Sequence, residues 1–227
     1  MIEFRGKLIP TTMEELVAPK HSALIVIDVQ NDLCLKGAYG GMIEKQRLDI
    51  STYEDTIKNI RSVLEAARKA KVMIIYTQHT ALPNSVSVSA AQMRWRMKMH
   101  RVSDPKLIPE ICVEGSWGQR VIDEIKPLPG DIIVKKNRPS AFMGTNLDII
   151  LRNNDIRTIV TAGVVTWGCV LSTVRNGDAR DYFVVVLEDC VNSHRKDLDD
   201  AELKIMNYRF DVVSSSEIIK LWSSGEN

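Results

Sequence analysis

Short runs of apolar residues rich in Val and Ile recur along the whole chain. Six such runs occur, at residues 23–29, 72–78, 131–135, 158–164, 183–188 and 210–213. Between them, apolar residues fall three and four positions apart, as in 56–67 and 147–151, which is the spacing of one face of a helix. Because continuous apolar strands that alternate with helices belong to parallel sheets buried on both faces, the pattern predicts an α/β protein.

The length of the chain suits one substantial domain. Its 227 residues contain no internal repeat and no linker-like stretch. Hydrophobic residues make up 44% and charged residues 26%, close to the average for globular proteins, so a packed core is expected. We therefore predict a single domain over residues 1–227, with residues 1–20 as an N-terminal extension. The expected fold is a Rossmann-like three-layer sandwich, with a mainly parallel sheet of about six strands and helices on both faces.

Two long segments interrupt the alternation of strands and helices. They cover residues 31–52 and 80–115, each after a predicted strand, and long insertions in a compact domain are often functional loops or lids. Within the second, residues 90–101 read AAQMRWRMKMHR and place Met and Trp side chains at helical spacing. This pattern favours packing or a subunit contact. A substrate lid and a nucleic-acid contact remain alternatives.

Charge and hydropathy argue against several classes of partner. The 30 Lys and Arg residues nearly balance the 29 Asp and Glu residues, giving a formal charge of +1 and no broad field to attract nucleic acid. The N-terminus lacks the apolar stretch of a signal peptide, and no run of about eighteen apolar residues occurs. We expect a soluble cytoplasmic protein that binds neither nucleic acid nor membranes.

Four cysteines lie far apart in the sequence. Cys34, Cys112, Cys169 and Cys190 form no C-x-x-C pair and have no histidine at the spacing of metal ligands. Reduced thiols are therefore expected. For any one of them, a buried and inert thiol is the commoner explanation.

Three chemically different side chains fall where predicted strands end. Asp28, Lys136 and Cys169 follow or end the first, third and fourth runs, and ligands of open parallel sheets bind at the carboxyl ends of the strands. Singly, each has an ordinary explanation as a loop cap, a solvated cation or a buried filler. Together they suit covalent catalysis, in which a thiol must be activated. Cys169 is expected to open a helix, whose N-terminus favours negative charge on sulfur, and Asp28 is a candidate acceptor for its proton.

The segments around these residues resemble one known family. ALIVIDVQND, VKKNRPSAF and GVVTWGCVLST are similar to the aspartate, lysine and nucleophile motifs of the isochorismatase-like cysteine hydrolases. The resemblance extends from residue 22 to the C-terminus. It implies a catalytic triad of Asp28, Lys136 and Cys169, with Lys135 as the adjacent alternative to Lys136.

The resemblance also implies features that the residues alone do not show. A cis peptide bond is expected between Val164 and Val165, and the backbone N–H groups of Val165 and Cys169 are expected to form the oxyanion hole. Family members are commonly homo-oligomers, so a dimer or a tetramer is expected. No organic cofactor and no metal site are implied.

The resemblance implies a reaction but leaves the substrate open. Cleavage of isochorismate's vinyl ether needs no thiol, so an intact Cys169 favours hydrolysis of an amide or ureido C–N bond through a thioester, with release of ammonia or an amine. Nicotinamidases carry a metal site with histidine after the first strand, whereas residues 33–52 contain no histidine. EGSWGQRVIDEIKPLPGDIIV is similar to ureidoacrylate and other N-carbamoyl amidohydrolases. Isochorismatase-type and nicotinamidase-type hydrolases, and a non-catalytic interaction protein on the same fold, remain alternatives.

The candidate substrate-binding residues are of two kinds. Some differ from the family's usual residues, and others lie at the same edge of the predicted sheet as the triad. Trp167 stands where the family commonly has asparagine, and Gln78 and His79 end the second predicted strand. His79 has an alternative role in bonding a loop carbonyl. Phe142 and Asn31 complete the set.

Overall fold

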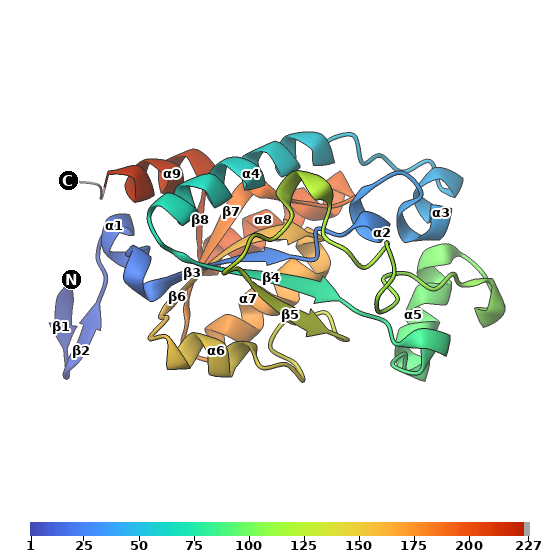
Figure 1. The fold of residues 1–227 in the computed structure, drawn as a ribbon, viewed down its shortest axis with the longest axis horizontal. Coiled ribbons are helices and arrows are strands. Elements are labelled where there is room, and N and C mark those ends of the chain that lie inside the picture. Colours follow the sequence, from blue (N-terminus) through green and yellow to red (C-terminus); the bar gives the residue numbers. More distant parts are fainter. Residues whose placement is uncertain (225–227) are drawn as a thin grey trace.

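The computed structural model describes residues 1–224 and contains the expected sheet. Six parallel strands lie in the order β5-β4-β3-β6-β7-β8. Their bounds are β3 Ser22–Ile27, β4 Met73–His79, β5 Ile132–Lys136, β6 Thr158–Val164, β7 Phe183–Asn192 and β8 Asp211–Val213. The prediction of a single-domain α/β fold with a parallel six-stranded sheet and helices on both faces is confirmed (Figure 1).

Helices cover the sheet on both faces. One layer contains α4 (Tyr53–Lys69) and α9 (Ser215–Ser223), and the other contains α6 (Leu147–Asn153), α7 (Leu171–Asp178) and α8 (Lys196–Arg209) (Figure 1). Because side chains alternate along a strand, β3 serves both layers: Leu24 and Val26 belong to the core under α4, and Ile25 to the core under α6 and α7.

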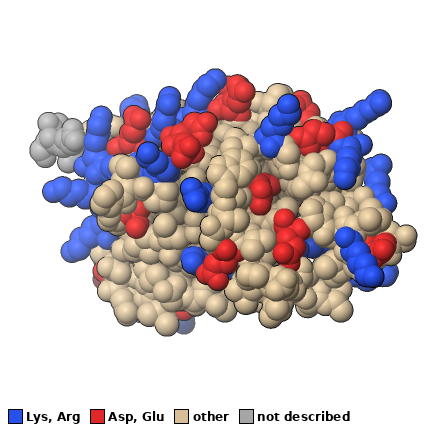
Figure 2. Space-filling view, turned by 45° about the vertical axis from the view of Figure 1, so that its right-hand side comes forward, with Lys and Arg blue, Asp and Glu red and all other residues tan. Residues whose placement is uncertain are grey.

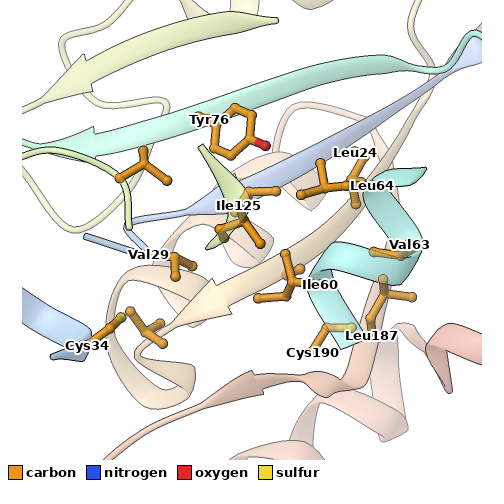
Figure 3. Packing of buried hydrophobic residues seen from close by; sticks show 14 of the residues in the cluster. Leu24, Val29, Cys34, Ile60, Val63, Leu64, Tyr76, Ile125, Leu187 and Cys190 are labelled. Atoms are coloured by element: carbon orange, nitrogen blue, oxygen red, sulfur yellow. The ribbon is translucent and has the colours of Figure 1, made fainter. Parts of the chain in front are cut away.

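The core between α4 and the sheet shows why residues 56–67 form a helix. Ile60, Val63 and Leu64 are buried on one side of α4 and lie over the strands near Leu24 and Leu187 (Figure 3). The first turn of the helix carries acidic residues and the last turn basic ones, which complements the helix dipole. Local propensity and burial therefore favour the same conformation.

The two long segments contain short helices rather than extended loops. Residues 31–52 include α2 (Asn31–Cys34) and α3 (Ala38–Lys45), and residues 80–115 include α5 (Ala90–His100) and the 3-10 turns Pro83–Ser85 and Pro105–Leu107. α5 begins with a capping box made by Ser89 and Gln92. In Figure 1 these helices lie at the carboxyl-end edge of the sheet.

The N-terminal residues lie at the opposite end. An exposed hairpin of β1 (Ile2–Phe4) and β2 (Lys7–Ile9) is followed by α1 (Met13–Leu16) and a 3-10 turn, Pro19–His21 (Figure 1). A further 3-10 turn, Asp123–Ile125, precedes β5. None of the helices in residues 1–224 has the length and apolar character needed to cross a membrane. Charges of both signs are interspersed on the face seen in Figure 2.

Candidate active site

Asp28, Lys136 and Cys169 come together at the carboxyl-end edge of the sheet. Asp28 directly follows β3, Lys136 is the last residue of β5, and Cys169 lies in a π-helical turn, η5 (Thr166–Val170), after β6. The first predicted strand ends earlier than its apolar run because the backbone turns at Asp28, where φ is 54°. This left-handed conformation costs free energy for a residue with a side chain and is concentrated at functional sites.

Asp28 and Lys136 form a fully buried ion pair. Lys136 Nζ lies 2.6 Å from Asp28 Oδ2, and both side chains have 0% relative exposure. Lys136 Nζ also donates to the carbonyl oxygen of Arg138 at 3.1 Å, and the Thr77 hydroxyl donates to Asp28 Oδ1 at 2.6 Å. A buried charge without such partners costs several kcal/mol. The pair and its two hydrogen bonds therefore keep a carboxylate and an ammonium ion in the protein interior.

Lys136 remains a cation at neutral pH. Burial by itself lowers the pKa of its ammonium group, but the charge of Asp28, with a smaller contribution from Cys169, outweighs burial and raises the pKa above its ordinary value of 10.5. Lys136 thus supplies a fixed positive charge beside the sulfur atom.

Cys169 interacts with both members of the pair, yet its thiol is protonated at rest. Burial raises the pKa of Cys169 to about 12, and the opposing effect of Lys136 is partly cancelled by Asp28. The expected activation by a helix N-terminus is not the dominant effect, since Cys169 lies within η5 rather than at the first position of α7. A thiol of this kind can react as a nucleophile only where a base removes its proton.

The backbone next to Cys169 has an unusual geometry. The peptide bond between Val164 and Val165 is cis. Within residues 1–224 the Val165 N–H donates no hydrogen bond, whereas the Val165 carbonyl accepts from Gly168 at 2.9 Å and from Val170 at 3.3 Å. One backbone donor therefore remains available beside the thiol.

The sulfur atom lies at a cavity of about 580 Å³ that is lined mainly by apolar side chains. Its wall includes Leu33 and Tyr39 from the first long segment, His79 at the end of β4, one side of α5, Arg138, and Val164, Val165, Trp167 and Gly168 around Cys169. Cys169 retains partial exposure, whereas Asp28 and Lys136 are buried below the cavity surface. Of the three groups, the thiol is therefore the one presented directly to a small molecule in this cavity.

Two of the five predicted substrate-binding residues line the cavity. His79 is one, and its Nδ1 atom is buried without a hydrogen-bond partner among the described residues. Burial, helped by Lys136, lowers the pKa of His79 to about 4, so the ring is neutral at neutral pH. Trp167 is the other, and its Nε1 donates to the Ser193 hydroxyl at 2.9 Å while its ring packs edge-on against His194.

The other three predicted residues do not line the cavity. Phe142 is buried in the core, where its ring stacks on Tyr182 with centroids 5.8 Å apart. Asn31 is buried and donates to the carbonyl oxygen of Trp117 at 2.8 Å, which fixes the segment before β5. Gln78 follows Thr77 along β4, and because successive strand side chains point to opposite faces, it does not share the orientation of Thr77 toward Asp28.

Gln30 and Asp32, which follow Asp28 in the sequence motif after the first strand, hold neighbouring backbone segments by hydrogen bonds. The sequence alone did not indicate this function. The side-chain amide of Gln30 bonds both backbone groups of His79, accepting from its N–H at 2.7 Å and donating to its carbonyl at 2.9 Å. It also donates to the carbonyl of Gln119 at 2.7 Å, and Asp32 Oδ2 accepts from the Cys112 N–H at 2.7 Å. The polar residues after Asp28 thus hold the cavity wall in place.

Arg96 is the main cavity residue that sequence reasoning missed. It lies on α5, is 7% exposed and lines the same cavity as Cys169. The mixture of basic and apolar residues at 90–101 was its only signal, since nothing in the sequence distinguishes Arg96 from Arg94, which is exposed.

The remaining thiols and the possible metal ligands are separate from this chemistry. Cys34, Cys112 and Cys190 are free and buried. Within residues 1–224, no group of three or more His, Cys, Asp or Glu side chains is positioned to hold a metal ion.

Comparison with known proteins identifies the family. A family model described as an isochorismatase domain matches residues 22–218, which is most of the chain. The chain belongs to the isochorismatase family. The predicted resemblance is thereby confirmed, and with it the assignment to a family of hydrolases.

Curated relatives within this family carry a more specific name. Ureidoacrylate amidohydrolase RutB from Cronobacter turicensis is 36% identical over 183 residues, covering 77% of this chain and 76% of the relative. The protein of the same name from Agrobacterium fabrum is 36% identical over 179 residues, covering 77% of both chains.

Solved structures of the family have the same fold. A cysteine hydrolase from Pseudomonas syringae pv. phaseolicola has a TM-score of 0.76 and 26% identity, covering 91% of this chain and 94% of its own. N-carbamoylsarcosine amidase from Thermoplasma acidophilum has a TM-score of 0.64 and 26% identity, covering 86% and 96%. Nicotinamidase from Bacillus subtilis, at 19% identity and a TM-score of 0.69, shares the fold.

Proposed function

We propose that this member of the isochorismatase family hydrolyses an amide or ureido C–N bond of a small molecule, with Cys169 as the nucleophile. The observation that carries the proposal is the arrangement of a cavity-facing thiol above a buried Asp28–Lys136 ion pair. The names of the curated relatives and of the amidase with the same fold favour N-carbamoyl compounds as the substrate class.

The raised pKa of the thiol determines the first step. Because Cys169 is protonated at rest, attack on the carbonyl carbon requires transfer of the thiol proton to the Asp28 carboxylate as the S–C bond forms. Lys136 stays protonated and stabilises the negative charge that passes between Asp28 and sulfur. Thr77 holds the other oxygen of Asp28 and fixes the orientation of the carboxylate.

The tetrahedral intermediate carries negative charge on the former carbonyl oxygen. The N–H groups of Val165 and Cys169 form the oxyanion hole in this proposal, supported by the absence of any other acceptor for the Val165 N–H among residues 1–224. Loss of one such donor costs on the order of a hundredfold or more in rate. Collapse of the intermediate breaks the C–N bond, and the leaving amine or ammonia takes the proton from Asp28.

Water completes the cycle. Asp28, again a carboxylate, accepts a proton from a water molecule that attacks the thioester, and the second tetrahedral intermediate expels Cys169 as the free thiol. For a ureido substrate, the acyl group released is carbamate, which decomposes to carbon dioxide and ammonia. His79 and Trp167 line the cavity and are the proposed contacts for the ureido group, His79 through its neutral and unpartnered ring.

The cellular location and the oligomeric state of the enzyme are also proposals. We infer that it works in the cytoplasm, supported by four free cysteines, and that it forms a homo-oligomer, as expected from the family. Isochorismatase-type and nicotinamidase-type activities are the enzymatic alternatives, and a non-catalytic interaction protein is the third.

A substrate panel with a nucleophile variant tests the function. Release of ammonia or amine is measured with ureidoacrylate, N-carbamoyl amino acids, biuret and nicotinamide, with and without a chelator. We expect turnover of a ureido compound, loss of at least about a thousandfold in Cys169→Ala, and a covalent adduct on Cys169 in quenched samples by mass spectrometry. Cys190→Ala, which removes a buried thiol outside the cavity, is the matched control and retains kcat.

The outcomes separate the alternatives. Turnover of nicotinamide that disappears with chelator favours the metal-dependent branch, and turnover that survives in Cys169→Ala contradicts the thioester mechanism. A protein that releases nothing from any amide and shows no alkylation selective for Cys169 is the non-catalytic alternative.

A further inference from the structure

Arg96 is a buried cation without a hydrogen-bond or ion-pair partner among residues 1–224. It is 7% exposed and lines the cavity that contains Cys169. No ion pair and no hydrogen bond joins its guanidinium group to any other group of residues 1–224. Burial of an unpaired charge is unfavourable by several kcal/mol, so a buried arginine facing a cavity implies an anion that occupies the cavity.

The rest of the cavity wall does not compensate this charge. Among the described residues that line it, none is Asp or Glu, whereas Arg138 is a second cation. Arg138 Nη1 donates to the backbone carbonyls of Ser87 at 3.1 Å and Asn137 at 2.7 Å, which leaves its charge unpaired as well. Lys136 is neutralised by Asp28 below the surface. The cavity thus carries a net positive charge near α5.

One carboxylate influences Arg96 from outside the cavity. Glu110 and the buried Cys112 partly offset the effect of burial, which lowers the pKa of Arg96. Glu110 is exposed, does not line the cavity and accepts a hydrogen bond from the Ser85 hydroxyl at 2.9 Å. It therefore does not replace an anion within the cavity.

Arg96 lies on the face of α5 that lines the cavity. Ala91, Gln92, Trp95, Arg96, Met99 and His100 line the cavity, and this spacing is one face of α5. Arg94 projects from another face and is exposed. The mixed composition of residues 90–101 is therefore explained by a wall that combines apolar contacts with one buried guanidinium group.

We infer that Arg96 binds a carboxylate of the substrate and makes the enzyme selective for anionic amides or ureido compounds. A guanidinium group presents two N–H donors in a planar fork that matches the two oxygens of a carboxylate. The carboxylate at Arg96 and the scissile carbonyl at Cys169 then lie in one cavity, which both residues line. The identity of the scissile bond rests on the proposed function, whereas recognition of the carboxylate does not.

The experiment pairs one variant with two substrates. Arg96→Met keeps the side-chain length and removes the charge, and Arg94→Met is the matched exposed control on the same helix. The substrates are 3-ureidopropionate and its neutral analogue (3-hydroxypropyl)urea. We expect Arg96→Met to lower kcat/KM for the carboxylate by about 10- to 100-fold, with a change below about threefold for the neutral analogue and for either substrate with Arg94→Met.

A binding measurement separates this inference from the proposed function. Isothermal titration calorimetry measures how tightly the Cys169→Ser protein and the Cys169→Ser/Arg96→Met double variant bind 3-ureidopropionate and (3-hydroxypropyl)urea. This gives the same comparison without turnover. If no ureido compound is hydrolysed but the carboxylate binds through Arg96, the proposed reaction fails and the recognition site stands. Equal losses for both ligands, or a larger loss in Arg138→Met than in Arg96→Met, overturn the assignment.

The wild-type protein provides a test if Arg96→Met does not fold. We expect 3-ureidopropionate and benzoate each to bind Cys169→Ser at least tenfold more tightly than (3-hydroxypropyl)urea and benzyl alcohol, respectively. A Cys169→Ser protein that binds neither carboxylate more tightly than its neutral counterpart overturns the assignment.

Discussion

Cys169 differs from the other three cysteines in its neighbours rather than in its degree of burial alone. Burial raises the pKa of all four thiols. Only at Cys169 does a lysine ammonium group oppose burial strongly, with a carboxylate close enough to accept the proton. Cys169 is therefore a neutral thiol at rest, which avoids a thiolate in a cavity that is mainly apolar.

The pH dependence of alkylation follows from the pKa of about 12 at Cys169. Below that pKa the thiolate is the minor form, and its fraction rises tenfold for each pH unit. We expect the rate of reaction with iodoacetamide to rise about tenfold per unit from pH 6 to 9 without a plateau. Mass spectrometry localises the label, and Cys169→Ala gives the background from the three buried thiols. A plateau below about pH 8 contradicts a neutral resting thiol.

The residues that the sequence places together correctly are those whose location in the fold follows from their position along the chain. Asp28, Lys136 and Cys169 each follow or end an apolar run, and parallel strands bring such positions to one edge of the sheet. Thr77 and Arg96 were missed because their roles depend on which neighbour they face. Phe142, a predicted substrate contact, lies in the core and does not line the cavity, since an apolar residue beside a motif packs equally well in the core.

The strand and turn that carry Cys169 depend on one glycine. Gly163 has a φ of +123°, and it pairs with Ile27 of β3 just before the chain turns at Asp28. A Cβ atom at this position lies 2.1 Å from the Ile27 carbonyl oxygen, which is backbone and cannot rotate away. Only glycine allows β6 and β3 to approach closely at the point where the chain continues from β3 to Asp28 and from β6 toward Cys169.

Gly163→Ala tests this requirement. We expect the free energy of unfolding to fall by about 3 kcal/mol or more, because the clash adds to an unfavourable backbone conformation. Gly130→Ala is the matched control: Gly130 also has a positive φ, of +100°, but open space around its Cβ position, so about 1–2 kcal/mol is expected. Urea unfolding measures both. Equal losses for the two variants show that close approach is not the reason for Gly163.

The elements were predicted more accurately in the sheet than in the segments between β3 and β5. Buried parallel strands leave a continuous apolar signal, so six runs gave six strands. α5 has buried and exposed residues of mixed character, because its inner face contacts a cavity instead of a packed core. The hydrophobic periodicity of α5 is therefore weak, and its role at the cavity is visible only in the structure.

At the scale of the whole molecule, the carboxyl-end edge of the sheet and the N-terminal hairpin lie at opposite ends of the sheet (Figure 1). The family match begins at residue 22, after the hairpin. Every residue of β1 and β2 is exposed, whereas Val17 is buried and its carbonyl accepts a hydrogen bond from Trp222 Nε1 at 2.9 Å. The extension therefore has an inner part that belongs to the core and an outer part, the hairpin, whose residues are exposed.

Deletion of residues 2–10 tests whether this outer part serves a neighbouring subunit. Within one chain it cannot reach the cavity, so kcat/KM is expected to stay within about twofold, and the free energy of unfolding within about 0.5 kcal/mol, as for other surface changes. Deletion through residue 17 is the contrasting variant, and it destabilises the protein by removing the buried Val17. Sedimentation velocity reports the subunit number in each case. A tenfold fall in kcat/KM in the shorter deletion, together with dissociation, shows instead that the apolar hairpin residues complete the active site of a partner subunit.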